Sequence, residues 1–191
     1  MSNAYSTSPP TWAGWGLSNT TRHRACFRCC VAHYHNIYGP LATWEGGREK
    51  APAAIARKVA LAKIGGRHEI EIWGDGQQTR SFTYIDDCLR GTELLMQSDF
   101  VEPLNIGSDE MVSINQLVDI VEEIAGVKLA RRYDPSAPKG VRGRNSDNTL
   151  ISEVLGWAPA TPLRDGMEKT YAWVYDQVKA RAGSRTAAAA C

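Results

Sequence analysis

Two arginines lie in the densest group of polar side chains in the chain, Arg142-Gly143-Arg144-Asn145-Ser146-Asp147-Asn148. The residues Leu150 to Leu155 predict a short helix that Gly156 ends, so this segment is expected to be a loop at a helix N-terminus. Guanidinium groups bind phosphate oxygens in a planar fork, and a helix N-terminus adds partial positive charge. The segment is therefore a candidate phosphate-binding site, and a solvated basic loop is the alternative.

A second candidate site surrounds the turn Gly74-Asp75-Gly76. Trp73 precedes the turn, and Gln77-Gln78-Thr79-Arg80 follow it. An aromatic ring, two amides and a guanidinium at one turn could stack on a nucleotide and hydrogen-bond to it. A plain β-hairpin explains the two glycines equally well.

A third candidate is Gly46-Gly47-Arg48-Glu49-Lys50-Ala51-Pro52, a charged triplet between a glycine pair and a helix start. A lysine beside an anionic ligand could be a charge partner or a general acid. The simpler alternative is the exposed N-terminus of a surface helix. The chain has only four histidines, His23, His33, His35 and His68, which disfavours a Ser/His/Asp triad.

The N-terminal cluster of His23, Cys26, Cys29, Cys30, His33 and His35 has a Cys-x-x-Cys spacing that a zinc module could use. No second distant pair completes the pattern, and incidental reduced cysteines are the favoured alternative. The chain has five cysteines, an odd number that does not indicate a disulfide framework. We therefore assign no metal site.

The elements that must position these groups are short strands and helices in alternation. Five helices are predicted: at 49–64, after an N-cap at Asp86 or Asp87, from the Ser113/Gln116 capping box to Gly126, at 150–155, and after Thr161-Pro162. Strands are predicted at 69–73 and 80–85, which would form a hairpin, and at 103–107 and 127–133. Long, nearly all-apolar strands and a glycine-rich phosphate turn are missing from the pattern. The sequence predicts an accessory α/β lobe rather than a complete doubly wound domain.

Composition sets the outer limits of the interpretation. The chain has 191 residues, 43% hydrophobic and 23% charged, with a formal net charge of +1, which is typical of an ordinary globular domain and disfavours a nucleic-acid binder. No apolar run is long enough for a membrane span or a signal peptide, so we expect no membrane partner and a cytoplasmic location. We expect an irregular segment at 1–30, a folded portion at 31–180 and an Ala-rich disordered tail at 181–191.

The candidate segments together resemble a known family. The motifs are His35-Asn36-Ile37-Tyr38-Gly39-Pro40, Gly46 to Ala54, Trp73-Gly74-Asp75-Gly76 with Gln78 to Thr83, Asn105 to Ser113, and Arg142 to Asn148. They resemble the GDP-mannose 3,5-epimerase family of the extended short-chain dehydrogenases/reductases over about Val31 to Lys179. The resemblance implies the C-terminal substrate-binding lobe of such an α/β enzyme, with the N-terminal NAD-binding Rossmann half largely missing.

The resemblance also implies an activity. Such an enzyme binds NAD tightly, oxidises GDP-mannose at C4, exchanges protons at C3 and C5, and returns the hydride to give GDP-L-galactose on the ascorbate and cell-wall sugar route. It implies a homodimer and a nucleotide-sugar ligand, without nucleic acid or membrane.

Site residues follow from the same resemblance. The acid lysine corresponds to Lys50, flanked in the sugar pocket by Glu49 and Ala51. Asn36, Lys58, Gln78, Thr79 and Arg80 match substrate-binding positions, and Arg144 matches the diphosphate-binding arginine. The family's dinucleotide turn, its Tyr-x-x-x-Lys pair and its base cysteine have no counterpart, so we expect a truncated chain. The alternatives are a non-catalytic GDP-sugar-binding fragment, a partner of full-length subunits, or a zinc module.

Overall fold

The computed structural model describes residues 29–137 and 142–189, the last six of these by their backbone alone. The helices are α1 (Ala51–Gly65), α2 (Ile85–Gln97), α3 (Ile114–Ala125), α4 (Thr149–Leu155) and α5 (Leu163–Ala189). The strands are β1 (Ala32–Tyr34), β2 (Ile37–Tyr38), β3 (Glu69–Trp73), β4 (Thr79–Ser81), β5 (Thr83–Tyr84), β6 (Leu104–Ile106), β7 (Met111–Ser113), β8 (Ala130–Asp134) and β9 (Gly143–Arg144). The predicted α/β class is confirmed.

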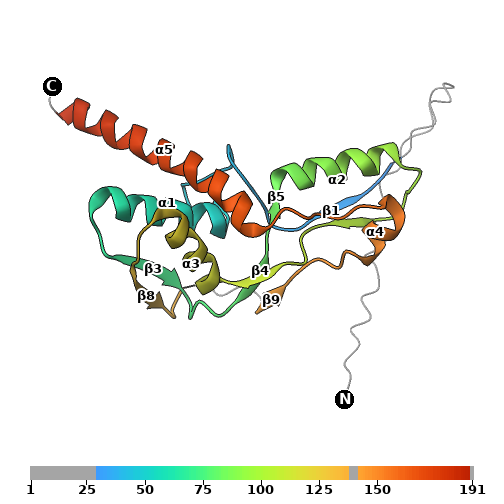
Figure 1. The fold of residues 1–191 in the computed structure, drawn as a ribbon, viewed down its shortest axis with the longest axis horizontal. Helices are drawn as coiled ribbons and strands as arrows, with labels where there is room; N and C mark the ends of the chain where they lie inside the picture. The colour runs from blue at the N-terminus through green and yellow to red at the C-terminus, as the bar shows by residue number, and fades with distance from the viewer. Residues whose placement is uncertain (1–28, 138–141, 190–191) are drawn as a thin grey trace, which may run out of the picture.

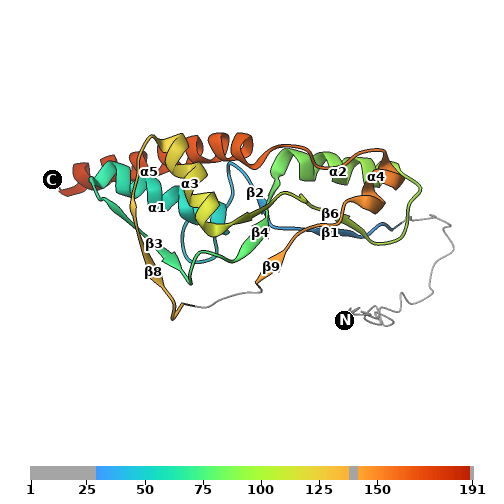
Figure 2. The same cartoon turned by 60° about the horizontal axis from the view of Figure 1, so that its bottom comes forward.

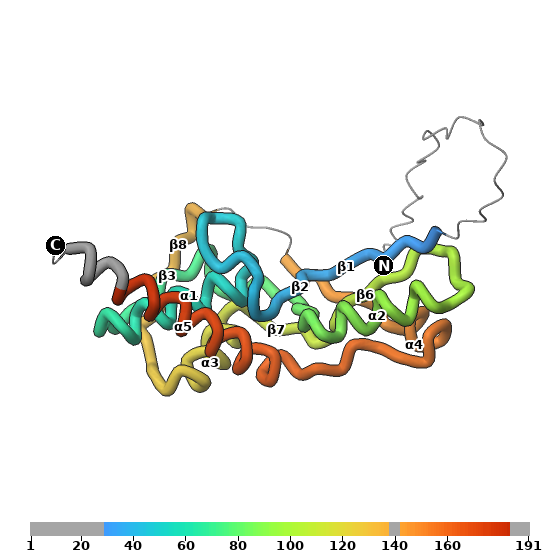
Figure 3. Tube along the Cα trace, turned by 90° about the horizontal axis from the view of Figure 1, so that it is seen from above, coloured from blue at the N-terminus to red at the C-terminus, as the bar shows by residue number. Residues whose placement is uncertain are grey.

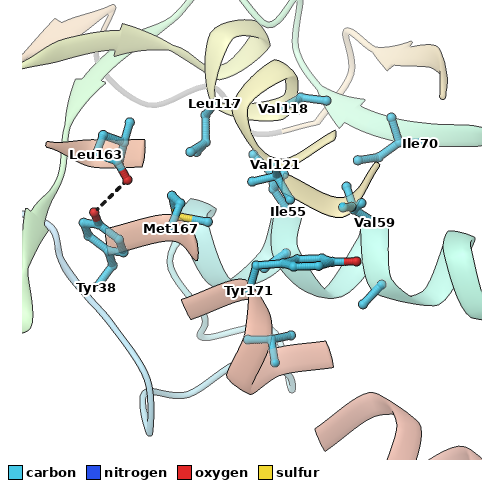
Figure 4. Packing of buried hydrophobic residues seen from close by; sticks show 14 of the residues in the cluster. Tyr38, Ile55, Val59, Ile70, Leu117, Val118, Val121, Leu163, Met167 and Tyr171 are labelled. Atoms are coloured by element: carbon cyan, nitrogen blue, oxygen red, sulfur yellow. Dashed lines mark hydrogen bonds between the residues drawn. The ribbon is translucent and has the colours of Figure 1, made fainter. Parts of the chain in front are cut away.

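The larger part of the molecule is built from α1, α3 and α5 against the parallel pair β3 and β8 (Figure 1). Val59, Val121 and Val174, one from each helix, are fully buried where the helices meet. Figure 4 shows the neighbouring side chains of this core, including Tyr38, whose hydroxyl donates to the Leu163 carbonyl at 3.2 Å. Burying these apolar side chains is the main stabilising term for this part of the fold.

Local signals set the ends of α1 and α3. The Ser113 hydroxyl accepts the Gln116 N–H at 3.1 Å, and the Gln116 side chain accepts the Ser113 N–H at 2.7 Å, so the predicted capping box is confirmed. Gly126 and Gly66 follow α3 and α1 in the left-handed conformation, which a glycine adopts without steric cost.

A smaller part of the molecule contains the parallel pair β1 and β6 with α2 and α4. Its core consists of Leu95, Leu104, Ile106 and Ile151. Figure 2 shows α1, α5 and α2 along one side of the molecule and the strands below them. The two cores are distinct clusters, which gives the molecule the elongated outline seen in Figure 3.

The prediction that Asp86 or Asp87 caps α2 is wrong. The helix begins at Ile85 after Tyr84, and no side chain caps it. Asp87 instead accepts the backbone N–H groups of Ala160 and Thr161, at 3.1 and 2.8 Å. A carboxylate in the first turn still complements the helix dipole, while its hydrogen bonds hold the segment that leads into α5.

The predicted hairpin of β3 and β4 is also wrong. β3 pairs with β8, whereas β4 pairs antiparallel with β7 and parallel with β9. The turn between them is held by α3, since the Asn115 N–H donates to the Gly76 carbonyl at 3.0 Å. A Cβ on Gly76 would lie 2.4 Å from the Asn115 side chain, so close packing explains this glycine.

Helix α5 continues to Ala189, so it extends into residues that the composition had assigned to a disordered tail. The reason is the alanine run, because alanine has the highest helix propensity. The segment 1–28, which covers nearly all of the predicted irregular N-terminal segment, lies outside the described residues. Within the described ranges, no helix is both long and apolar enough to cross a membrane.

Candidate functional site

A cavity of about 270 Å³, here called the α1–β3 cavity, opens between the start of α1, the end of β3 and the residues before β4. Four of the predicted site residues line it: Glu49, Ala51, Lys58 and Gln78. Ala54, Ile55, Ile72 and Ile114 supply apolar surface, and Gly47, Arg57, Glu71 and Trp73 complete the lining. An apolar pocket with a few converging polar groups is typical of a small-molecule site.

Glu49 is fixed by two hydrogen bonds in the lining of this cavity. Its carboxylate accepts the Arg57 guanidinium at 2.8 Å and the Gly47 N–H at 2.7 Å, and its side chain is 6% exposed. Burial alone would raise the pKa of the Glu49 carboxyl, but the backbone N–H groups and Arg57 outweigh it and hold that pKa below its usual value. Glu49 is therefore a charged, preorganised group.

Lys58 directly follows Arg57 in α1, and its side chain reaches β3. Its ammonium donates to the Glu71 carbonyl at 2.8 Å and lies 5.7 Å from the centre of the Trp73 ring. Burial lowers the pKa of Lys58, partly offset by the nearby Glu71 carboxylate. Desolvation makes this cation a stronger partner for an anion entering the cavity.

Two arginines lie on paired strands, β4, which begins directly after the cavity residue Gln78, and β9. Arg80 on β4 is directly opposite Arg144 on β9, and side chains at paired positions of neighbouring strands share a face of the sheet. Gln78 donates from its amide to the Trp73 carbonyl at 3.0 Å, and Thr79 donates its N–H to the Arg142 carbonyl at 2.9 Å. The structure thus brings the segment around the Gly74-Asp75-Gly76 turn next to the segment Arg142 to Asn148. Two arginines on paired strands are suited to binding a diphosphate.

Lys50 and Asn36 lie away from the α1–β3 cavity. Lys50 lines a second cavity of about 210 Å³ with Tyr38, Arg48 and Ala53, here called the Lys50 cavity. The backbone at Lys50 is extended, so the consecutive side chains of Glu49 and Lys50 point to different sides. Asn36 donates to the Ser81 carbonyl at 3.0 Å and has φ of 40°, a conformation that asparagine tolerates.

Arg57 and Glu71 were missed by the sequence analysis. Arg57 follows its partner Glu49 by eight residues, a separation that no helical spacing rule connects. Glu71 had a usable signal, because the alternation of Glu69, Glu71 and Trp73 places them on one face of β3.

The parallel strands β1 and β6 each lead into a further strand. β1 leads through His35 and Asn36 into β2, and β6 leads through Gly107 to β7, so in the ranges given above neither of these parallel strands passes through a glycine-rich turn into a helix. Of the residues in the zinc hypothesis, His23 and Cys26 lie outside the described residues. Cys29 and Cys30 are exposed free thiols. The part of the chain that is described holds no metal-binding group of three or more His, Cys, Asp or Glu residues.

Comparison with known proteins confirms the predicted resemblance. The model of the GDP-mannose 4,6 dehydratase family matches residues 12–170 and so reaches into the first 30 residues. GDP-mannose 3,5-epimerase 1 of Oryza sativa subsp. indica is 54% identical over 151 residues, and GDP-mannose 3,5-epimerase of Arabidopsis thaliana is 52% identical over the same length. Each match covers 79% of this chain and 39% of the relative, so the chain spans about two fifths of their length.

Solved structures agree on the fold. UDP-glucose 4-epimerase of Thermotoga maritima with UDP-glucose has a TM-score of 0.70 at 30% identity, covering 78% of this chain and 46% of that one. UDP-glucuronic acid 4-epimerase of Bacillus cereus, in complex with UDP-glucuronic acid and NAD, has a TM-score of 0.65 at 29% identity with the same coverage. The fold is that of the substrate-binding part of an extended short-chain dehydrogenase/reductase, and the chain belongs to the GDP-mannose 4,6 dehydratase family.

Proposed function

We propose that this chain forms the nucleotide-sugar-binding part of a GDP-mannose 3,5-epimerase, which converts GDP-mannose to GDP-L-galactose. The observation that carries the proposal is the gathering of Glu49, Ala51, Lys58 and Gln78 around one cavity. These residues are spread over thirty positions of the sequence, and the resemblance assigns all four to the substrate. The names and identities of the rice and Arabidopsis relatives support GDP-mannose as the ligand.

The two cavities divide the ligand between them. The α1–β3 cavity, with the exposed Trp73 ring at its edge and the apolar surface of α1, suits a nucleobase. Arg80 and Arg144 would neutralise the diphosphate, a remote binding interaction that orients the sugar. The Lys50 cavity would then take the sugar, and Glu49 and Ala51, which the resemblance puts beside Lys50 in the sugar pocket, would lie on the nucleotide side instead.

Lys50 is the proposed acid of the epimerisation. An ammonium next to the sugar can give a proton to carbon and stabilise the enolate that forms when a neighbouring C–H loses its proton. The nucleotide-sugar relatives of this fold include a complex with NAD, which supports NAD as the cofactor of the reaction. NAD, when bound, would supply the hydride transfer at C4 of the sugar.

Calorimetric titration of the 191-residue chain with GDP and with GDP-mannose tests this division. Lys58→Ala should weaken both ligands to a similar degree, because Lys58 lines the cavity assigned to the nucleotide. Lys50→Ala should weaken GDP-mannose and leave GDP unchanged. Equal loss of both ligands in Lys50→Ala, or no binding of GDP-mannose to the parent chain, would contradict the proposal.

A further inference from the structure

Glu71 is a carboxylate in the α1–β3 cavity that none of the predicted motifs includes. It lies on the same face of β3 as Trp73, and its side chain is 36% exposed. One carboxylate oxygen accepts the Trp73 indole N–H at 3.3 Å, and the other is paired with Arg132. The carboxylate is thus held beside the aromatic ring at the edge of the cavity.

We propose that Glu71 selects guanine over other bases in this cavity, an inference that rests on the proposed function and adds a specificity residue to it. Guanine presents two adjacent donors, its ring N1–H and its exocyclic amino group. An ionised carboxylate has only acceptors and can take both hydrogen bonds at once. The base would lie against the ring of Trp73, a residue that is 54% exposed.

Other bases fit a carboxylate less well. Uracil presents a single N–H between two carbonyl oxygens, so at least one carboxylate oxygen would face another acceptor. Adenine presents an acceptor next to its amino group. A site built around hydrogen bonds to a ligand rejects the analogue that cannot make them, because its own polar groups are then left unpaired. Glu71 therefore discriminates by the pattern of donors on the base.

The present partner of Glu71 can give way to a base. The Arg132 side chain is 59% exposed and also lies 3.9 Å from Glu69, so its pairing with Glu71 is a surface ion pair and weak. The backbone carbonyl of Glu71 accepts the Lys58 ammonium, so the carboxylate is the group of Glu71 that can exchange the exposed Arg132 for the donors of a base.

The size of the cavity fits a base rather than a whole nucleotide sugar. Its volume is about 270 Å³, whereas sites that enclose a drug-sized ligand measure about 300–1,000 Å³. The ring system of guanine would fill the space between α1 and Trp73, and the ribose and diphosphate would leave toward Arg80. Base recognition is therefore the task of the residues that line this cavity.

Glu69 supplies a matched control on the same strand. It is two residues from Glu71, it shares the partner Arg132, and its side chain is 65% exposed without lining the cavity. Glu69→Gln removes the same charge from the same strand, so it reports any general effect of charge on the binding of an anionic nucleotide.

Calorimetric titration of the full 191-residue chain with GDP, inosine diphosphate and UDP tests the assignment. Inosine diphosphate lacks only the exocyclic amino group of guanine. We expect the parent chain to prefer GDP over inosine diphosphate by about tenfold, the cost of one hydrogen bond to a charged group, and over UDP by more. Glu71→Gln should abolish both preferences by weakening GDP, and Glu69→Gln should keep them.

Each outcome distinguishes the two proposals. If the parent chain binds GDP and Glu71→Gln retains the parent ratios of GDP to inosine diphosphate and to UDP, Glu71 does not select the base while the nucleotide site stands. If the parent chain binds none of the three nucleotides, the proposed function and the role of Glu71 both fail. If Glu69→Gln loses the preferences as Glu71→Gln does, the effect is one of charge and the assignment is overturned.

Discussion

Arg57 on α1 holds the carboxylate of Glu49, eight residues before it, by a hydrogen bond of 2.8 Å. The same carboxylate accepts the N–H of Gly47, so one guanidinium fixes the glycine segment that comes before Lys50. Gly46 and Gly47 both have positive φ, a conformation in which other residues are strained. Arg57 is therefore the residue that links helix α1 to the segment presenting the proposed acid.

Arg57→Ala should destabilise the chain by about 1–3 kcal/mol, because it leaves the nearly buried Glu49 carboxylate without its ionic partner. Urea unfolding followed by circular dichroism measures the change. Arg90→Ala, which removes an exposed pair with Glu93, is the control and should change stability by less than about 0.5 kcal/mol. Equal effects of the two substitutions would show that the Glu49 pair has no special role.

Acid should weaken the fold through carboxyls whose pKa values are lowered by their partners, among them the ion-paired Glu49 and Asp119. A carboxyl with a lower pKa in the folded state stabilises the fold above its unfolded pKa, and that stabilisation is lost as the pH falls through the folded value. The melting temperature should therefore drop as the pH falls below about 4.5, the usual value for glutamate.

Glu49→Gln should make the melting temperature less dependent on pH in that range, since the glutamine does not titrate. Glu93→Gln removes a carboxylate from an exposed pair and should leave the parent slope nearly intact. An unchanged slope in Glu49→Gln would mean that Glu49 does not carry the acid sensitivity.

The elements that sequence analysis predicted well are those with signals inside the element. Ser113 and Gln116 cap α3 as their spacing indicates, and the alternation of Glu69 to Trp73 gives the exposed and buried faces of β3. The hairpin failed because strand pairing is not local: β4 finds β7 and β9, and Asn115 holds the turn from another element. The cavity residues Arg57 and Glu71 depend on the same long-range packing.

Gly166→Ala should destabilise the chain by about 1–3 kcal/mol through overpacking. A Cβ at Gly166 would lie 2.2 Å from the Tyr38 hydroxyl, which donates to Leu163 in the core. Gly183→Ala, in the same helix with no atom near its Cβ, should instead be neutral or stabilising by up to about 1 kcal/mol. Thermal melts of both variants check this contrast, and a parent-like melt of Gly166→Ala would contradict the packing argument.

Arg144→Ala should weaken GDP by about tenfold or more, because the guanidinium is proposed to hydrogen-bond to the diphosphate. The affinity for guanosine, which has no phosphate, should stay at the parent value. Titration of both ligands separates loss of a phosphate contact from damage to the base site. A parallel loss of guanosine affinity would show that Arg144 supports the fold around the cavity instead.

Hydrogen–deuterium exchange of the 191-residue chain with and without saturating GDP-mannose tests the central claim most directly. The account predicts slower exchange in residues 47–58 and 71–78, which hold most of the residues lining the α1–β3 cavity, while α2 and β6 in the smaller part keep their rates. Unchanged exchange in both cavity segments, or protection concentrated in α2 and β6, would contradict the assignment of this cavity to the nucleotide sugar.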